Sequence, residues 1–190
     1  VTDDGSGIEG SDISLAFEKH ATSKISNFND LYDIYSLGFR GKALASIVSV
    51  SNVIAISKTK DSQVGKKIEF KNNKSKESSI ATNTGTSIEV IDLFNNLPVR
   101  KKFLKSDIAE TNSISKLMYS FAIGYKDISF KYIKDNRVEF ISHANEPLDI
   151  KIPKLLDSNL KENLINISIK DQVYKVEGFI SNPNYYRGSR

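Results

Sequence analysis

The strongest constraint on the fold is a continuous apolar stripe between Glu110 and Tyr125. Its members recur every three or four residues, as on one face of an α-helix, and they are Ile114, Leu117, Met118, Phe121, Ala122 and Tyr125. A hairpin is expected directly after this helix, with strands at Ile128–Lys134 and Arg137–Ile141 joined by a turn at Asp135-Asn136. This part of the chain therefore combines a long helix with a pair of antiparallel strands.

Shorter elements are predicted on either side of this helix. Upstream they are helices at Asp12–His20 (N-cap Ser11), Asn29–Tyr35 and Gly41–Val48, and strands at Val53–Ser57, Lys66–Phe70 and Thr86–Leu93. Residues 58–77 hold seven Lys against three acidic residues, and we expect Lys71–Ser79 to be a solvated hairpin loop. Residues 143–163 are expected to be a linker with a short helix, followed by a second hairpin at Leu164–Lys170 and Val173–Ile180.

Composition excludes several classes of protein. The 190 residues suffice for one domain, or for one domain and part of another. Hydrophobic residues make up 39% and charged residues 26%, which excludes collagen-like, mucin-like and wholly disordered chains. The absence of Cys excludes disulfides, Cys-zinc sites and thiol catalysis, and two His argue against a multi-histidine metal site. A net charge of +4 permits an anionic partner without demonstrating one.

The two ends of the sequence predict an internal piece of a longer protein. The chain opens on Val1 and enters a strand at once, without Met or a leader pattern. It ends after a strand pattern that does not close a fold. No apolar run approaches the roughly 18–20 residues of a membrane span.

The first candidate site is the turn Asp3-Asp4-Gly5-Ser6-Gly7. Glycines allow a ligand to approach the backbone closely, and a carboxylate can accept a hydrogen bond from an exocyclic amine such as that of adenine. A calcium loop is the second interpretation, but its alternating acids and terminal Glu are missing. Taken alone, the segment is best interpreted as an ordinary surface turn.

The second candidate is His20-Ala21-Thr22-Ser23-Lys24, at the end of the first predicted helix. Its two hydroxyls and one amine are suited to an anion site. The alternative is the end of a helix, where cationic side chains meet the negative end of the helix dipole.

The third candidate is Gly38-Phe39-Arg40-Gly41-Lys42-Ala43-Leu44. Glycines directly before a helix leave its first free N–H groups open to a phosphate, and Arg40 adds a fork of donors. The alternative is that Gly38 and Gly41 only separate two helices. The spacing matches neither a Walker loop nor a dinucleotide fingerprint.

The fourth candidate is the strand that begins at Gly85-Thr86, together with the basic segment that follows it. Thr86 is placed to hydrogen-bond a ligand, although ordinary edge-strand chemistry explains it equally well. Residues 99–107 hold four basic side chains, Arg100, Lys101, Lys102 and Lys105, against one acid. Such a cluster can bind nucleic-acid phosphates, but it is more often a solvated face.

In their order along the chain, these segments resemble the MutL family of DNA mismatch-repair ATPases. The matching motifs are Asp3–Ile8, His20–Ile25, Ser36–Leu44, Gly85–Val90, Asp92–Leu104 and Gly178–Pro183. The resemblance covers essentially the whole chain, and its His-Ala-Thr-Ser-Lys and Gly-Phe-Arg-Gly blocks together are highly specific to the family.

The resemblance implies an α+β fold. The expected architecture is a two-layer α/β sandwich of the gyrase, Hsp90, histidine-kinase and MutL type, with a mixed, mostly antiparallel sheet. The corresponding domains are an ATPase domain in residues 1–142, incomplete at its N-terminus, a linker in 143–163, and the start of an S5-like transducer domain in 164–190.

The resemblance also assigns roles around ATP. Asp3 would meet the adenine amino group, Gly5 and Gly7 would allow close approach, and Thr86 would support the same contact directly or through water. Thr22, Ser23 and Lys24 would lie in a mobile lid. The phosphates would be wrapped by the backbone of Gly38, Phe39, Arg40, Gly41, Lys42, Ala43 and Leu44.

The catalytic Glu and the Asn that binds Mg²⁺ are expected upstream of residue 1, and a phosphate-sensing Lys downstream. No catalytic residue or metal ligand is therefore expected within the chain. We expect ATPase activity in the parent protein, and little hydrolysis or ATP binding by this chain alone.

The partners implied by the family are DNA, the mismatch-recognition protein MutS and a second copy that dimerises with ATP, in the bacterial cytoplasm near the nucleoid. The DNA-facing candidates are Arg100, Lys101, Lys102 and Lys105.

Two residues depart from the family pattern. Lys42 stands where the family usually has Glu, and Asp4 stands where Asn is common. Lys42 keeps open a second hypothesis, a non-catalytic DNA- or protein-binding module with a decayed nucleotide site. Another ATPase of the same superfamily, such as a type II topoisomerase subunit or a chaperone, is the third.

Overall fold

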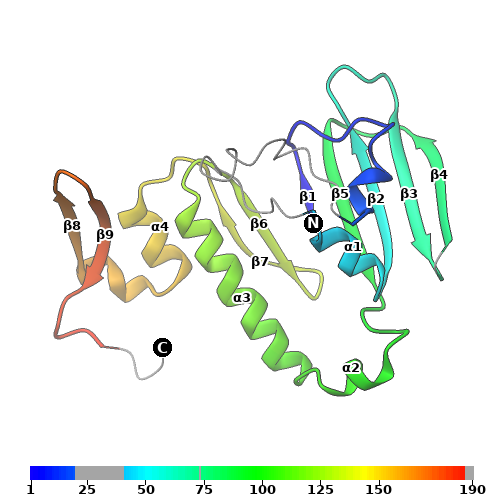
Figure 1. The fold of residues 1–190 in the computed structure, drawn as a ribbon. Helices are drawn as coiled ribbons and strands as arrows, with labels where there is room; N and C mark the ends of the chain where they lie inside the picture. The colour runs from blue at the N-terminus through cyan, green and yellow to red at the C-terminus, as the bar shows by residue number, and fades with distance from the viewer. Residues whose placement is uncertain (20–40, 73, 187–190) are drawn as a thin grey trace. The chain divides into compact units, whose positions relative to one another are not determined.

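The structure is a computed structural model that describes residues 1–19, 41–72 and 74–186. The chain forms two compact units, Val1–Leu104 and Lys105–Arg190. Both units combine helices with antiparallel strand pairs, as expected for an α+β protein (Figure 1). No helix within the described ranges is both long and apolar enough to cross a membrane.

The first unit is built on a five-stranded sheet in the order β1-β5-β2-β3-β4. The strands are β1 (Thr2–Asp3), β2 (Asn52–Lys58), β3 (Gly65–Lys71), β4 (Lys74–Ile80) and β5 (Gly85–Ile91). Every neighbouring pair is antiparallel. Among the described strands, β1 pairs only with β5, so the N-terminal turn lies at one edge of the sheet that they form and β4 lies at the other.

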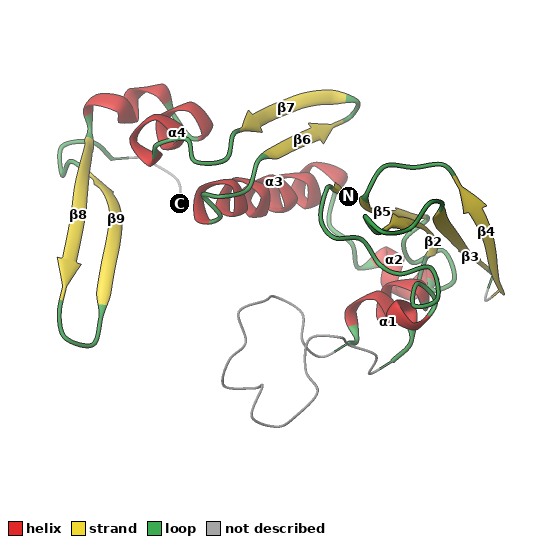
Figure 2. Ribbon diagram, turned by 90° about the horizontal axis from the view of Figure 1, so that it is seen from above, coloured by secondary structure: helices red, strands yellow, loops and turns green. Residues whose placement is uncertain are grey.

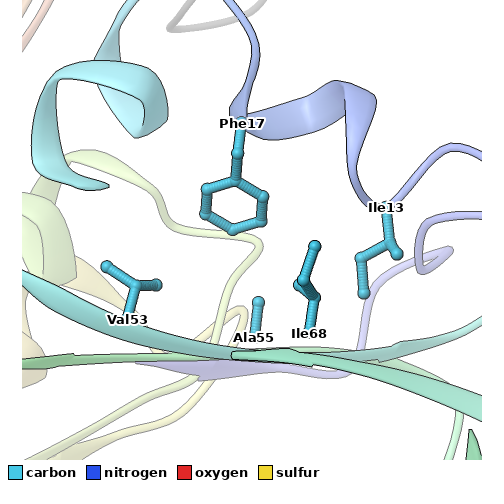
Figure 3. Close-up of a cluster of buried hydrophobic side chains, with 5 residues drawn as sticks. All are labelled: Ile13, Phe17, Val53, Ala55 and Ile68. Atoms are coloured by element: carbon cyan, nitrogen blue, oxygen red, sulfur yellow. The ribbon is translucent and has the colours of Figure 1, made fainter. Parts of the chain in front are cut away.

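Two short helical segments, η1 (Leu15–Phe17) and α1 (Ala43–Val48), cover one face of this sheet. Val53 and Ala55 alternate along β2 and face Ile13 and Phe17, as Figure 3 shows. The ring centroids of Phe17 and Phe70 lie 4.8 Å apart. This apolar layer fixes α1 and the N-terminal segment on the sheet, because burying their side chains removes apolar surface from water.

The second unit contains α3 (Asp107–Gly124), β6 (Phe130–Lys134), β7 (Arg137–Ser142), α4 (Leu148–Leu155), η3 (Ser158–Glu162), β8 (Leu164–Lys170) and β9 (Lys175–Ser181). Helix α3 runs beside the β6–β7 hairpin in Figures 1 and 2. Ala122, Phe140 and Leu155 form the buried cluster between α3, β7 and α4. Asp135 and Asn136 have φ of 49° and 61°, as a tight hairpin turn requires.

Most predicted elements are confirmed with shifts of a few residues at their ends. The predicted helices Gly41–Val48 and Glu110–Tyr125 correspond to α1 and α3, and both predicted hairpins of the second unit are present. Residues 143–163 contain α4 and η3, and Leu155 of α4 belongs to the buried cluster. The predicted helix Asn29–Tyr35 lies outside the described residues.

The predicted helix Asp12–His20 is wrong over its described part. A turn in which the Asp12 N–H donates to the Glu9 carbonyl precedes the three-residue η1, and Glu18 is already extended. Ser11 is not a cap; its hydroxyl donates to the Asp12 carboxylate. Ile13 and Phe17 are held by the sheet, so tertiary packing decides the local conformation here.

The prediction of a solvated loop at Lys71–Ser79 is also wrong. Residues Lys74–Ile80 form β4, which pairs with β3 along its whole length. Its side chains are almost all exposed, so the segment lacks the apolar alternation that indicates a strand. An edge strand needs only main-chain partners on one side, and it can therefore be as polar as a loop.

Candidate nucleotide site at the Asp3 turn

Asp3 and Thr86 lie opposite each other because β1 pairs with β5. Asp3 Oδ1 accepts hydrogen bonds from the backbone N–H of Gly5 at 3.0 Å and of Thr86 at 3.2 Å. These two donors fix the orientation of the carboxylate. Its second oxygen makes no hydrogen bond to any residue that the structure describes, and the side chain is exposed. The turn therefore presents one fixed, free acceptor oxygen to solvent.

Two glycines are required where this turn meets the sheet. Gly7 has a φ of 76°, and a Cβ there would lie 2.1 Å from the carbonyl oxygen of Lys58. Gly85 has a φ of 123°, and a Cβ there would lie 2.1 Å from the carbonyl oxygen of Asp3. Neither position accepts a side chain without backbone movement. The glycines bring protein backbones together, which positions Asp3 at the sheet edge.

Ser57 lies beneath this turn and was not singled out from the sequence. Its side chain is 1% exposed, and its Oγ accepts the backbone N–H of Ile8 at 2.8 Å. The Ser57 hydroxyl donates to the Gly85 carbonyl at 3.1 Å and shares a 2.9 Å hydrogen bond with Thr86 Oγ1. The only available signal was a hydroxyl at the third buried position of β2, after Val53 and Ala55.

The Ser57 hydrogen bonds determine what Thr86 can offer to a ligand. Ser57 has one hydroxyl proton, and the bond to the Gly85 carbonyl uses it. Thr86 must then donate its own proton to Ser57, which leaves only acceptor capacity on Thr86 Oγ1. Asp3 and Thr86 therefore both present acceptors. Such a pair is complementary to a ligand that carries N–H donors.

The described part of the third motif begins α1. Gly41 has a φ of 57°, and Lys42 is the exposed N-cap with no side-chain capping bond. The first helical hydrogen bond runs from the Ser46 N–H to the Lys42 carbonyl at 3.0 Å, so the N–H groups of Ala43, Leu44 and Ala45 have no helical partner among the described residues. Leu44 packs on the core below.

The structure does not test every predicted site residue. Thr22, Ser23, Lys24, Gly38, Phe39 and Arg40, together with His20, lie outside the described residues. Asp3, Gly5, Gly7 and Thr86 are brought together. Within the described ranges no hydrogen bond joins them to Gly41, Lys42, Ala43 or Leu44.

The basic candidates fall in both units. Arg100, Lys101 and Lys102 form the last turn of α2 (Pro98–Lys102), an exposed helix in the first unit. Lys105 begins the second unit, and its backbone N–H donates to Glu110 Oε1 at 3.0 Å. None of the four cations has an ion-pair partner among the described residues, so their charge is available to an anion.

A separate cavity of about 290 Å³ lies at the other end of the sheet from Asp3. Asn52, Phe70, Lys71, Asn95 and Asn96 are among its lining residues, and no predicted site residue is. In residues 1–19, 41–72 and 74–186, no group of three or more His, Asp or Glu side chains is placed to hold a metal ion.

Comparisons with known proteins identify the family. A scan against protein-family models finds no match. The chain is 40% identical over its whole length to the DNA mismatch repair protein MutL of Clostridium acetobutylicum, covering 31% of that protein. It is 44% identical over 96% of its length to MutL of Dictyoglomus turgidum, covering 32% of it. The chain thus spans about a third of the length of the curated relatives it matches.

Solved structures agree on the fold. The Aquifex aeolicus MutL ATPase domain complexed with ADP matches 88% of this chain, with a TM-score of 0.67 and 24% identity, and the match covers 58% of that structure. Another structure of this ATPase domain matches 99% of the chain, with a TM-score of 0.71 and 22% identity, and the match covers 62% of that structure. With alignments over the whole chain and this shared fold, the chain belongs to the MutL family of DNA mismatch-repair proteins.

Proposed function

We propose that this chain supplies part of an ATP-binding site in a mismatch-repair protein. In this proposal, ATP closes a lid and drives dimerisation of two copies around DNA, which couples mismatch recognition by MutS to strand incision. The observation that carries the proposal is the paired acceptor arrangement of Asp3 and Thr86, organised by Ser57. A MutL ATPase domain complexed with ADP has the same fold, which supports a nucleotide as the ligand.

The adenine amino group is the donor that this arrangement would bind. The free Asp3 oxygen accepts one N–H of the amine, since the other oxygen is held by Gly5 and Thr86. Thr86 Oγ1 accepts a hydrogen bond from the base directly or through a bridging water. A guanine would present a carbonyl oxygen where adenine has its amine, so two facing acceptors would reject it.

The phosphates are proposed to bind where α1 begins. Within the described ranges, the backbone N–H groups of Ala43, Leu44 and Ala45 have no helical partners, and Lys42 is exposed beside them. Gly38, Phe39, Arg40 and Gly41 would complete the phosphate loop, and Thr22, Ser23 and Lys24 would belong to the lid. Mg²⁺ would neutralise the triphosphate, with its protein ligand outside the described residues.

Nucleotide-dependent dimerisation of the full-length protein tests this proposal. Asp3→Asn should weaken binding of a non-hydrolysable ATP analogue by one to two orders of magnitude, measured by calorimetry. The two N–H donors would hold the amide oxygen of the new side chain, so its NH₂ group would face the adenine amine. Dimerisation measured by sedimentation should then no longer respond to nucleotide.

The neighbouring carboxylate provides a matched control. Asp4 is also exposed, and Asp4→Asn makes the same chemical change one residue away. This variant should keep nucleotide binding and dimerisation. If the unmodified protein shows no heat of binding, the decayed module is the correct interpretation; if it dimerises equally with and without nucleotide, the clamp proposal fails.

A further inference from the structure

The outer edge of β4 has no neighbouring strand in the part of the chain that the structure describes. In the described residues β4 pairs with β3 on one side and has no strand on the other. Lys74–Ile80 therefore presents one side of its main chain to solvent, with the donors and acceptors that an added strand uses. Figure 1 shows β4 at the margin of the sheet of the first unit.

The charges near this edge are unbalanced. Lys71 and Lys74 lie directly opposite each other in the β3–β4 pair, an arrangement of like charges that costs stability. Lys76 lies opposite Glu69, but the Glu69 carboxylate is already ion-paired with Lys67. Lys71, Lys74 and Lys76 therefore share one sheet face, and none has an ion-pair partner in the part of the chain that the structure describes.

The spacing of these lysines specifies the partner. Lys74 and Lys76 are two residues apart on one strand, so both point to the same face. A strand added beside β4 would place its own alternate residues next to them. A parallel, in-register copy of β4, or an antiparallel copy centred on Ser75, would bring lysine against lysine, which disfavours self-association in those registers. Acidic side chains at alternate positions of the added strand would instead attract Lys74 and Lys76.

We propose that β4 is a docking edge for an extended acidic peptide segment of a partner protein, with Asp or Glu at every second position. The peptide main chain continues the sheet, and its carboxylates pair with Lys74 and Lys76. A nucleic acid would also be attracted by the lysines, but it has no main-chain N–H and C=O groups to match the free edge. This site lies on the far edge of the sheet from Asp3 and does not require nucleotide.

Fluorescence anisotropy on the full-length protein tests this proposal with two peptides of identical composition. One alternates Glu with Thr, and the other groups its Glu residues at one end. The alternating peptide should bind about tenfold more tightly, since only it places two carboxylates beside the lysines. N-methylation of the amides that face β4 should remove binding, because the added strand then loses its main-chain hydrogen bonds to β4.

Charge reversal supplies the matched variants. The double variant Lys74→Glu with Lys76→Glu should bind the alternating Glu peptide at least tenfold more weakly. The same variant should bind a peptide that alternates Lys with Thr, because its charges are now complementary to that peptide. Lys126→Glu with Lys161→Glu makes the same net charge change at exposed lysines of the second unit and should leave binding intact. Equal binding of the two Glu peptides, or N-methylation without effect, would overturn the proposal. Displacement of the peptide by duplex DNA with no sensitivity to N-methylation would assign the site to nucleic acid instead.

Discussion

At the scale of single residues, Ser57 is the group on which the geometry of the candidate site depends most. One buried hydroxyl satisfies the Ile8 N–H, the Gly85 carbonyl and the Thr86 hydroxyl. A residue that connects the N-terminal turn, β2 and β5 in this way positions the ligand-facing atoms without touching a ligand itself. Its contribution should appear in stability and in nucleotide affinity together.

Ser57→Ala should lower the free energy of unfolding by about 1–3 kcal/mol, because it removes the hydrogen-bond partner of the part-buried Ile8 N–H and of the Gly85 carbonyl. Nucleotide affinity should fall as well, since Thr86 loses the acceptor that orients its hydroxyl. Urea denaturation and calorimetry measure the two effects. Ser78→Ala, at an exposed position of β4, should change stability by less than about 0.5 kcal/mol. Equal effects of the two substitutions would show that Ser57 has no special role.

The residues of the candidate site differ in how well the sequence alone reveals their role. Asp3 and Thr86 belong to recognisable motifs, and the β1–β5 pairing places them opposite each other, although their contact with a ligand stays a prediction. Ser57 belongs to no such motif. Its importance arises from its position in the folded sheet, where three segments distant in sequence converge, and no local pattern encodes that convergence.

At the scale of elements, sequence periodicity identified α3 but only part of the face that it buries. The predicted stripe included Ile114, Leu117 and Tyr125, and all three are exposed. Met118 and Ala122 of the stripe do belong to the buried cluster, together with Tyr119 from outside the stripe, and the Tyr119 and Phe140 ring centroids lie 5.0 Å apart. A helix whose apolar residues extend over more than one face does not reveal from sequence alone which face a neighbouring sheet will cover.

The secondary structure of polar segments is hard to predict from sequence for a related reason. β4 is held by its main-chain bonds to β3, and main-chain bonds leave no mark in the side-chain pattern. The segment ending in η1 shows the opposite case, because Ile13 and Phe17 have helical spacing but follow the sheet surface. In both cases the strand or surface alongside decides the conformation, so these elements could not be predicted from their own residues.

Glu146, which precedes α4, forms an ion pair with Lys154 in the last turn of α4, and this pair has a predictable pH response. The Lys154 Nζ–Glu146 Oε1 distance is 3.0 Å, and the hydrogen bond from Lys154 lowers the pKa of the Glu146 carboxyl below its ordinary 4.5. A carboxyl group whose pKa is lower in the folded state stabilises the fold above the unfolded pKa. That stability is lost as the pH falls below about 4.5 and through the lowered value.

Lys154→Met should therefore destabilise the protein by less than about 1 kcal/mol at pH 7, since Lys154 is partly exposed and the pair is screened by solvent. The difference between this variant and the unmodified protein should shrink as the pH is lowered from 5 towards 3. Denaturation midpoints across this range measure it. Lys161→Met, at an exposed lysine of η3, should show no such pH dependence. A difference that stays constant at low pH would assign the effect to packing rather than to charge.

At the scale of the whole molecule, charge distribution matters more than net charge. The chain carries only four more cations than acids, yet residues 99–106 contain four basic side chains and no acid. Arg100, Lys101 and Lys102 project from an exposed helix without ion-pair partners in the described ranges. A small net charge with a local cationic cluster favours contact with a polyanion at one surface over general electrostatic attraction.

This distribution makes the proposed DNA contact measurable through its salt dependence. Each phosphate that a protein cation neutralises on duplex DNA adds about 0.9 to the slope of log affinity against log salt concentration. Replacing Arg100, Lys101 and Lys102 together by Gln should lower the magnitude of that slope by up to about 3, with affinity falling similarly for all DNA sequences.

Replacing Lys126, Lys161 and Lys170 by Gln removes the same charge from exposed positions of the second unit and should change the slope little. If both triple variants lower the slope equally, the protein responds to its net charge, and the α2 cluster is an ordinary solvated face. If only the α2 variant does so, three adjacent side chains carry the phosphate contact.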